Sequence, residues 1–226
     1  MSADPLFPLA LGDRRLRRVQ AVWRRWRARA ARALEPLGAG AGGFVWHAVV
    51  RGRMVGAVAP SSRRLARAMA AAADGADRIV ELGAGTGAVT SALVERHAGR
   101  PLSACEIDPE WAAALRRRFP AVPVCALPAD QALAQLVLPP CDKVVLVSSL
   151  PFRSLPEPWH GRTRQAIEAF LLADPRRRLV QYTYQPRAPF TPLHTDRLVW
   201  HCRSTVWGNM PPAWVWELRR PDSEAG

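Results

Sequence analysis

The sequence predicts a single α/β domain built around a mostly parallel β-sheet. Its 226 residues, of which 49% are hydrophobic and 23% charged, are enough for one domain with a large core. After Gly75, short apolar segments alternate with helical ones, which is typical of parallel strands joined by helices. A glycine-rich loop between the first of these strands and the next helix supports the same architecture.

Arginine dominates the first 60 residues, which we interpret as an extension (1–60) that precedes the main domain (61–226). The chain has a formal net charge of +13, and this segment holds eleven arginines against three acidic residues. After a loosely ordered leader over 1–12, an amphipathic helix is expected from Asp13, because apolar side chains recur every three or four residues. These side chains are Leu16, Val19, Trp23, Trp26, Ala30 and Ala33.

The polar face of that helix is almost entirely cationic, and the glycine-rich stretch 38–43 ends it. Tryptophan on the apolar face with arginine beside it is typical of a helix that lies in the head-group zone of an anionic bilayer. The same arginines suit the phosphates of a nucleic acid. In the other interpretations the tryptophan face packs on the core, or arginine simply replaces lysine on solvated surfaces.

The remaining elements follow in order along the chain. A second helical region over 44–73 is broken near Pro60, after which Ser61 or Ser62 can cap a helix that continues through Ala71. The segments 197–202 and 214–218 are expected to form a final antiparallel pair. Between these regions, strands are predicted at 78–82, 102–107, 122–126, 143–148 and 179–184, and helices at 87–97, 109–119 and 163–173.

The motif with the clearest chemical meaning is Glu81-Leu-Gly83-Ala-Gly85-Thr-Gly87. Glycines between a strand and a helix let the backbone approach a ligand closely, although a tight turn could need the same glycines for packing. Glu106 ends the next strand about twenty residues later, where a carboxylate can accept both ribose hydroxyls of a nucleoside cofactor. The alternative for an acid at such a place is a helix cap, which is the role expected of Asp108 before Pro109.

Cysteine spacing and hydropathy restrict the class of protein. The four cysteines are widely separated and form no C-x-x-C pair, so neither a metal site nor a disulfide framework is expected. No signal peptide is recognised, and the longest weakly polar stretch, 39–50, is too short to span a bilayer. These observations predict a cytoplasmic protein that is soluble or attached to a membrane surface.

The glycine motif together with Glu106-Ile107-Asp108 resembles the cofactor-binding core of class I S-adenosylmethionine-dependent methyltransferases, over residues 78–218. The resemblance implies a Rossmann-like fold, with a mostly parallel seven-stranded sheet flanked by helices, and S-adenosyl-L-methionine as the cofactor. Nicotinamide dehydrogenases space their glycines as G-x-G-x-x-G and lack the acidic residue before the loop, which favours the methyl donor. The implied cofactor-binding residues are Glu81, Gly83, Gly85, Gly87, Glu106, Ile107 and Asp130.

Asp130 is the least regular of these residues. Methyltransferases of this group carry an Asp near the adenine, at about the place held here by Leu127 and Pro128. Asp130 is the nearest acid, and it either reaches the adenine by a different loop path or caps the helix that follows.

Four further stretches are similar to bacterial phospholipid N-methyltransferases, which convert phosphatidylethanolamine to phosphatidylcholine. This resemblance implies an aminolipid substrate, an anionic membrane surface as partner, a peripheral place on the cytoplasmic face of the inner membrane, and a monomer. Ornithine lipid and other aminolipids are substrate variants that the motifs do not separate. The stretches are 55–62 (VGAVAPSS), 149–156 (SLPFRSLP), 182–187 (YTYQPR) and 207–212 (WGNMPP).

The resemblance extends to ribosomal RNA adenine dimethylases, whose motif after the fourth strand is Asn or Asp, then Leu or Ile, Pro, and an aromatic residue. Ser149 stands here in place of the Asn or Asp that accepts a hydrogen bond from the exocyclic amine. This departure counts against adenine chemistry, and an RNA base methyltransferase is therefore the alternative function rather than the main one.

The candidate catalytic residues follow from the same resemblance and are Ser149, Phe152, Tyr182 and Tyr184. Aromatic faces could hold a lipid ammonium, and Tyr182 and Tyr184 point to one face because they lie two apart on a strand. In the competing interpretation, these aromatic residues belong to the core. Arg187 either binds the lipid phosphate or is an exposed loop arginine.

Overall fold

The computed structural model describes residues 60–139, 143–209 and 211–221, together with Arg17 and Ala21. The predicted leader, the amphipathic helix and the glycine-rich stretch therefore lie outside the described residues, except for Arg17 and Ala21, which are helical. The membrane-binding role of residues 1–60 stays a prediction, as does the domain boundary at residue 60.

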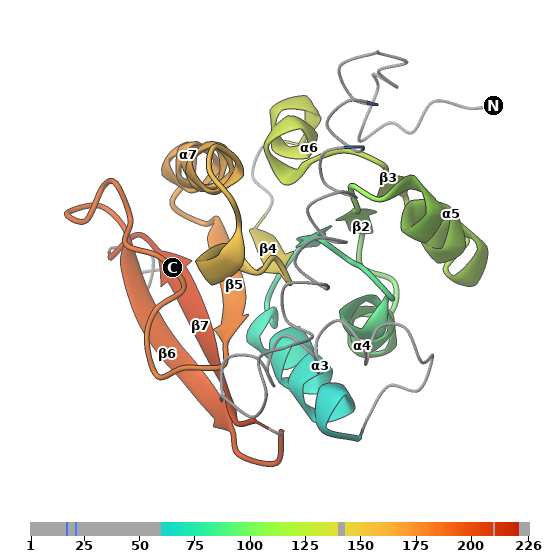
Figure 1. The fold of residues 1–226 in the computed structure, drawn as a ribbon, viewed down its shortest axis with the longest axis horizontal. Coiled ribbons are helices and arrows are strands. Elements are labelled where there is room, and N and C mark those ends of the chain that lie inside the picture. The colour runs from blue at the N-terminus through green and yellow to red at the C-terminus, as the bar shows by residue number, and fades with distance from the viewer. Residues whose placement is uncertain (1–16, 18–20, 22–59, 140–142, 210, 222–226) are drawn as a thin grey trace.

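The described part of the chain contains one seven-stranded sheet in the order β3-β2-β1-β4-β5-β7-β6 (Figure 1). Strands β1 to β5 are parallel, and β7 is antiparallel to both β5 and β6, so β6 runs in the same direction as β5. The strands are β1 (Arg78–Leu82), β2 (Leu102–Cys105), β3 (Val124–Cys125), β4 (Val144–Ser148), β5 (Arg178–Thr183), β6 (Val199–Val206) and β7 (Ala213–Arg219).

The strand order reverses beside β1, which pairs with β2 on one side and with β4 on the other. The chain leaves β1 toward one half of the sheet and later returns to build the other half. Loops that follow the neighbouring strands at such a point diverge and leave a crevice at the carboxyl ends of the strands. The topology therefore places a ligand site after β1, β2 and β4.

Helices cover both faces of the sheet. One face packs against α3 (Pro60–Ala72), α4 (Ala88–Arg96) and α5 (Pro109–Arg118), and the other against α6 (Ala129–Gln135) and α7 (Trp159–Leu172). Alternate residues of β4 divide between the two cores, since Val145 and Val147 join the first and Val144 and Leu146 the second. None of the described helices combines the length and apolar character needed to cross a bilayer.

Every strand and helix predicted after residue 60 is present, but several boundaries were predicted wrongly. Helix α3 begins at Pro60, so Ser61 and Ser62 lie in its first turn and not at its N-cap. Helix α7 begins at Trp159, four residues before the predicted start, because Pro158 can precede a helix. Strand β3 is two residues long instead of five, because only Val124 and Cys125 pair with β2. Strand β2 ends at Cys105 rather than at residue 107.

Gly87 is the N-cap residue of α4 and has a left-handed backbone conformation. Its φ angle is 79°, and a Cβ atom at Gly87 would lie 2.6 Å from Cε2 of Phe119 and 2.8 Å from Cδ2 of Leu115. An added methyl group at this position therefore meets both backbone strain and a filled core.

We predict that Gly87→Ala lowers the free energy of unfolding by about 2 kcal/mol more than Gly99→Ala does. Gly99 has the same φ angle of 79°, but nothing lies within 4 Å of the place that an added Cβ atom would take, so it carries the backbone strain alone. Urea denaturation of both variants measures the difference. Equal losses of stability would show that Phe119 and Leu115 move aside without cost.

Candidate functional site

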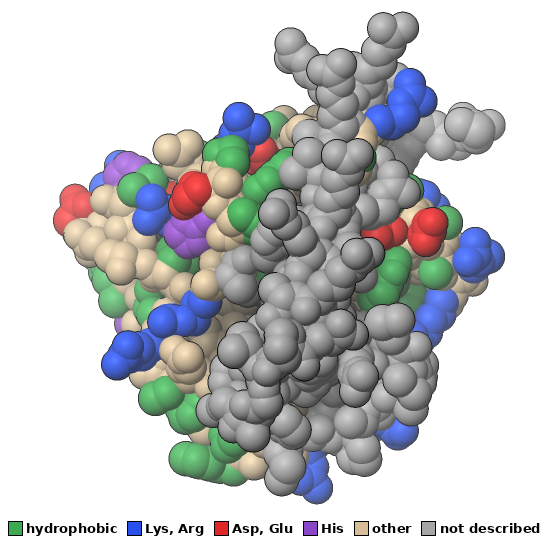
Figure 2. Space-filling model, in the orientation of Figure 1, with side chains coloured by type: hydrophobic (Ala, Val, Ile, Leu, Met, Phe, Trp, Pro, Cys, Tyr) green, Lys and Arg blue, Asp and Glu red, His purple; other side chains and the backbone are tan. Residues whose placement is uncertain are grey.

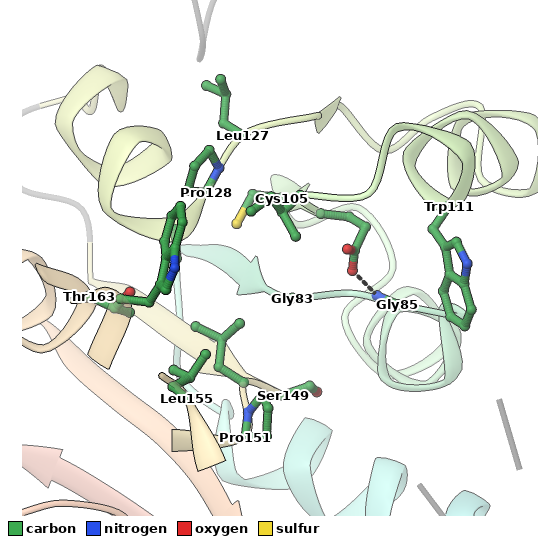
Figure 3. Close-up of a pocket in the computed structure, with 15 residues that line it drawn as sticks. Gly83, Gly85, Cys105, Trp111, Leu127, Pro128, Ser149, Pro151, Leu155 and Thr163 are labelled. Atoms are coloured by element: carbon green, nitrogen blue, oxygen red, sulfur yellow. Dashed lines mark hydrogen bonds between the residues drawn. The ribbon is translucent and has the colours of Figure 1, made fainter. Parts of the chain in front are cut away.

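A pocket lies at the carboxyl ends of β1, β2 and β4, as the topology predicts (Figure 3). The space inside it, including the part that opens to solvent, is about 700 Å³. Five of the predicted site residues line it, namely Gly83, Gly85, Glu106, Ile107 and Ser149.

Glu106 links the glycine loop to the loop after β2. Its Oε2 accepts a hydrogen bond of 2.7 Å from the Gly85 amide, drawn as a dashed line in Figure 3, and its Oε1 accepts one of 3.0 Å from the Asp108 amide. Asp108 in turn caps α5 by accepting from the amides of Glu110 and Trp111, as predicted. A carboxylate fixed in this way, at the wall of a pocket, can accept hydrogen bonds from the hydroxyl groups of a ligand.

Two hydrogen bonds hold the backbone of the loop after β4. The Ser149 amide donates to the Leu82 carbonyl at 2.9 Å, and the Gln181 side-chain amide donates to the Leu150 carbonyl at 2.9 Å. The glycine loop approaches so closely that a Cβ atom at Gly83 would lie 2.6 Å from Cδ2 of Leu150. The two loops therefore form one packed wall, and glycine at position 83 is required by the close approach.

Ser149 brings a buried hydroxyl group to this pocket. The residue is only 8% exposed, and its Oγ atom has no hydrogen-bond partner among the described residues. A buried hydroxyl without a partner is unfavourable by itself, so a ligand that offers a polar atom here gains a hydrogen bond.

Glu81 lies beneath the loop, at 0% exposure, and does not line the pocket. Its Oε2 accepts a hydrogen bond of 2.6 Å from the Thr90 hydroxyl, while its Oε1 has no partner in the described structure. Burial raises the pKa of the Glu81 carboxyl to about 7, and the nearby Glu106 charge adds to the rise while Thr90 opposes it. Glu81 therefore changes its protonation state near neutral pH.

The other predicted residues lie away from the pocket wall. Gly87 is the N-cap residue of α4. Asp130 lies in the first turn of α6, two residues past the N-cap Pro128, so it does not cap this helix, and its Oδ1 is unpaired among the described residues. Phe152 is 2% exposed and packs against Phe190, with ring centroids 4.7 Å apart. These positions match the competing interpretation of Phe152 as core.

Tyr182 and Tyr184 lie side by side, with ring centroids 5.4 Å apart and nearly perpendicular rings. Both are half-buried and pack against the core beneath α3, so they share one face of the sheet as their spacing predicts. Neither lines the pocket. Their role as aromatic contacts of a substrate stays a prediction.

Sequence reasoning missed much of the pocket lining. Trp111 projects from α5, and Trp159 and Thr163 lie four residues apart on α7 and therefore share a helix face. The predicted start of α7 at residue 163 left Trp159 in a loop and hid this spacing. Cys105 and Ala129 were also missed. Leu127 and Pro128 hold the place expected near the adenine, and Leu150, Pro151 and Leu155 lie in the stretch 149–156, but none of these five was predicted as a site residue.

Cys105 is the thiol in the pocket wall, and it is not set up as a nucleophile. A hydrogen bond with Cys125 and burial both raise its pKa, which keeps the thiol protonated. Among the described residues, no three His, Cys, Asp or Glu side chains gather closely enough to hold a metal ion.

No protein-family model matches the chain, and no curated protein sequence does. Solved methyltransferase structures, however, share its fold. A 1,6-didemethyltoxoflavin-N1-methyltransferase from Burkholderia thailandensis, solved with its substrate and S-adenosylhomocysteine, is 20% identical with a TM-score of 0.52, over 83% of this chain and 92% of that one.

Two further structures resemble the chain to a similar degree. A putative O-methyltransferase from Klebsiella pneumoniae is 15% identical with a TM-score of 0.51, over 88% of this chain and 99% of that one. A putative methyltransferase from Escherichia coli is 18% identical with a TM-score of 0.50, over 73% of this chain and 87% of that one. The chain therefore has the Rossmann-like fold of class I methyltransferases, as its sequence predicts.

Proposed function

We propose that this protein is an S-adenosylmethionine-dependent N-methyltransferase that acts on the amine head group of a membrane phospholipid, converting phosphatidylethanolamine towards phosphatidylcholine. The observation that carries the proposal is the pocket that Glu106, the glycine loop and Ser149 line together, with the Ser149 hydroxyl unpaired among the described residues. The lipid head group comes from the resemblance of four sequence stretches to phospholipid N-methyltransferases. The protein is peripheral at an anionic membrane, where residues 1–60 contribute positive charge.

The residues of the pocket fit S-adenosyl-L-methionine. Glu106 offers a fixed carboxylate for the ribose hydroxyls, and Ile107 and Pro128 offer apolar walls for the adenine. When bound, this cofactor supplies a methyl group attached to a sulfonium. Transfer of that methyl group needs no acid for the leaving group.

The task left to the protein is to present a neutral amine. A lipid ammonium is mostly protonated near neutral pH, and only the free amine has the lone pair that accepts a methyl group. Leu150, Leu155 and Trp159 make much of the pocket apolar, which disfavours the charged form and lowers the pKa of the amine. The Ser149 hydroxyl can then accept a hydrogen bond from the amine and orient it, while water accepts the proton.

We predict that Gln181→Leu weakens cofactor binding about tenfold, because the Leu150 carbonyl loses its donor and the wall of the pocket shifts. Gln181 is buried and lies outside the pocket, so any effect passes through the loop after β4. Titration calorimetry with S-adenosyl-L-methionine measures the change. Gln165→Leu, an exposed position on α7, is the matched control and should bind like the unmodified protein.

The function is tested by methyl transfer from isotope-labelled S-adenosylmethionine. The purified full chain is offered anionic liposomes with phosphatidylethanolamine, liposomes with ornithine lipid, and bulk ribosomal RNA. We expect label in the phosphatidylethanolamine pool. Label only in ornithine lipid would change the head group, label only in RNA would overturn the lipid proposal, and no cofactor binding at all would overturn the enzymatic one.

A further inference from the structure

The turn between β6 and β7 exposes an indole side chain at the carboxyl edge of the sheet. Trp207 is 74% exposed, whereas Trp214, whose ring centroid lies 6.2 Å away, is half-buried on β7. Because β6 runs in the same direction as β5, the end of β6 lies at the edge from which the loops of the pocket emerge. An exposed indole at this edge has no role in the core.

Positive charge lies on one side of this turn. Helix α3 begins beside it, since the Arg64 side chain contacts Gly208. Arg63, Arg64 and Arg67 are all exposed, and neither α3 nor the segment 206–213 contains an acidic residue. In Figure 2, hydrophobic side chains are visible at the lower edge of the view, on the side where Figure 1 shows the turn between β6 and β7.

We propose that the β6–β7 turn and the exposed arginines of α3 form a docking surface for an anionic lipid bilayer. Indole rings favour the boundary between head groups and acyl chains, and the arginine guanidinium forms bidentate hydrogen bonds with lipid phosphates. Trp207 enters the head-group zone while Arg63, Arg64 and Arg67 lie on the phosphates. The choice of a bilayer rests on the proposed function. A protein bound to the membrane through this surface would have the edge of the sheet that carries the pocket directed toward the lipid substrate.

Vesicle binding tests the surface without involving the reaction. Vesicles of phosphatidylglycerol and phosphatidylcholine are anionic but hold no primary amine to methylate. With the full chain at low salt, Trp207→Ala should lower the affinity about tenfold and Arg64→Gln about fivefold. Val137→Ala, which shortens an exposed apolar side chain elsewhere, is the matched control and should stay within about twofold of the unmodified protein.

A spectroscopic signal separates insertion from indirect effects. The emission spectrum of the unmodified protein minus that of Trp207→Ala should shift to the blue on adding these vesicles, because the indole enters a less polar medium. Thermal unfolding of both variants confirms that they are folded. An unchanged difference spectrum, or unchanged vesicle affinity in Trp207→Ala, would overturn the docking surface.

The methyl-transfer assay distinguishes this failure from failure of the proposed function. Vesicle binding that depends on Trp207 in a protein that methylates no lipid would retain the surface and reject the proposed reaction. If Trp207→Ala and Arg64→Gln methylate lipid as fast as the unmodified protein, the proposed reaction is retained and the docking surface is rejected. Loss of ribosomal RNA binding in Arg64→Gln, with vesicle binding unchanged, would reassign the surface to RNA.

Discussion

Glu106→Ala is expected to weaken the binding of S-adenosyl-L-methionine by about 100-fold or more. In the proposed site the Glu106 carboxylate accepts hydrogen bonds from two ribose hydroxyls, and each hydrogen bond to a charged group contributes about 1.5–3 kcal/mol. The substitution also removes the acceptor of the Gly85 and Asp108 amides, which loosens the loop that forms the pocket. Both effects act on binding, and titration calorimetry measures their sum.

A graded series tests the cause. Glu106→Gln keeps one oxygen acceptor but no charge, so its loss of affinity should be intermediate, about tenfold. Glu110→Ala is the control, because Glu110 is an exposed carboxylate in the first turn of α5 and does not line the pocket. If Glu106→Ala binds the cofactor as tightly as Glu110→Ala, then Glu106 only organises the loop and contacts no ligand.

Of the seven cofactor-binding residues that sequence patterns predicted, four line the pocket, because these four lie at the ends of two neighbouring strands. The glycine motif lies directly between a strand and a helix, and Glu106 directly follows the next strand, so a single rule about parallel sheets brings them together. The contact between Glu106 and Gly85 follows from that topology. The final antiparallel pair was also predictable from two apolar segments near the end of the chain.

The part of the pocket formed by α7 and the loop after β4 could not be predicted in the same way, since it depends on the directions of side chains from distant elements. Trp159 and Thr163 reach the pocket only because α7 begins at Trp159 and turns one face inward. Two residues of one motif lie in different places, since Ser149 lines the pocket and Phe152 packs against Phe190 in the core. Ser149 and Phe152 are only three residues apart in the segment that follows β4, and no periodic pattern shows which of the two side chains reaches the pocket.

Glu81→Gln is expected to remove a pH dependence of stability that the unmodified protein shows between pH 5 and pH 8. The pKa of Glu81 rises from 4.5 to about 7 in the folded protein, so over this range the folded state holds a proton that the unfolded state has released. Stability therefore falls as pH rises, by about 2–3 kcal/mol between pH 5 and pH 8. The sign is the opposite of that for a carboxylate held by an arginine.

Glutamine imitates the protonated form of Glu81 and can still accept the hydrogen bond from Thr90. The variant should therefore be more stable than the unmodified protein at pH 8 and nearly equal to it at pH 5, as measured by urea denaturation at both pH values. Glu95→Gln, which changes an exposed carboxyl on α4, is the matched control and should follow the unmodified protein. If Glu81→Gln has the same pH dependence as this control, then Glu81 does not bind the extra proton, and its unpaired oxygen must already be stabilised as a carboxylate.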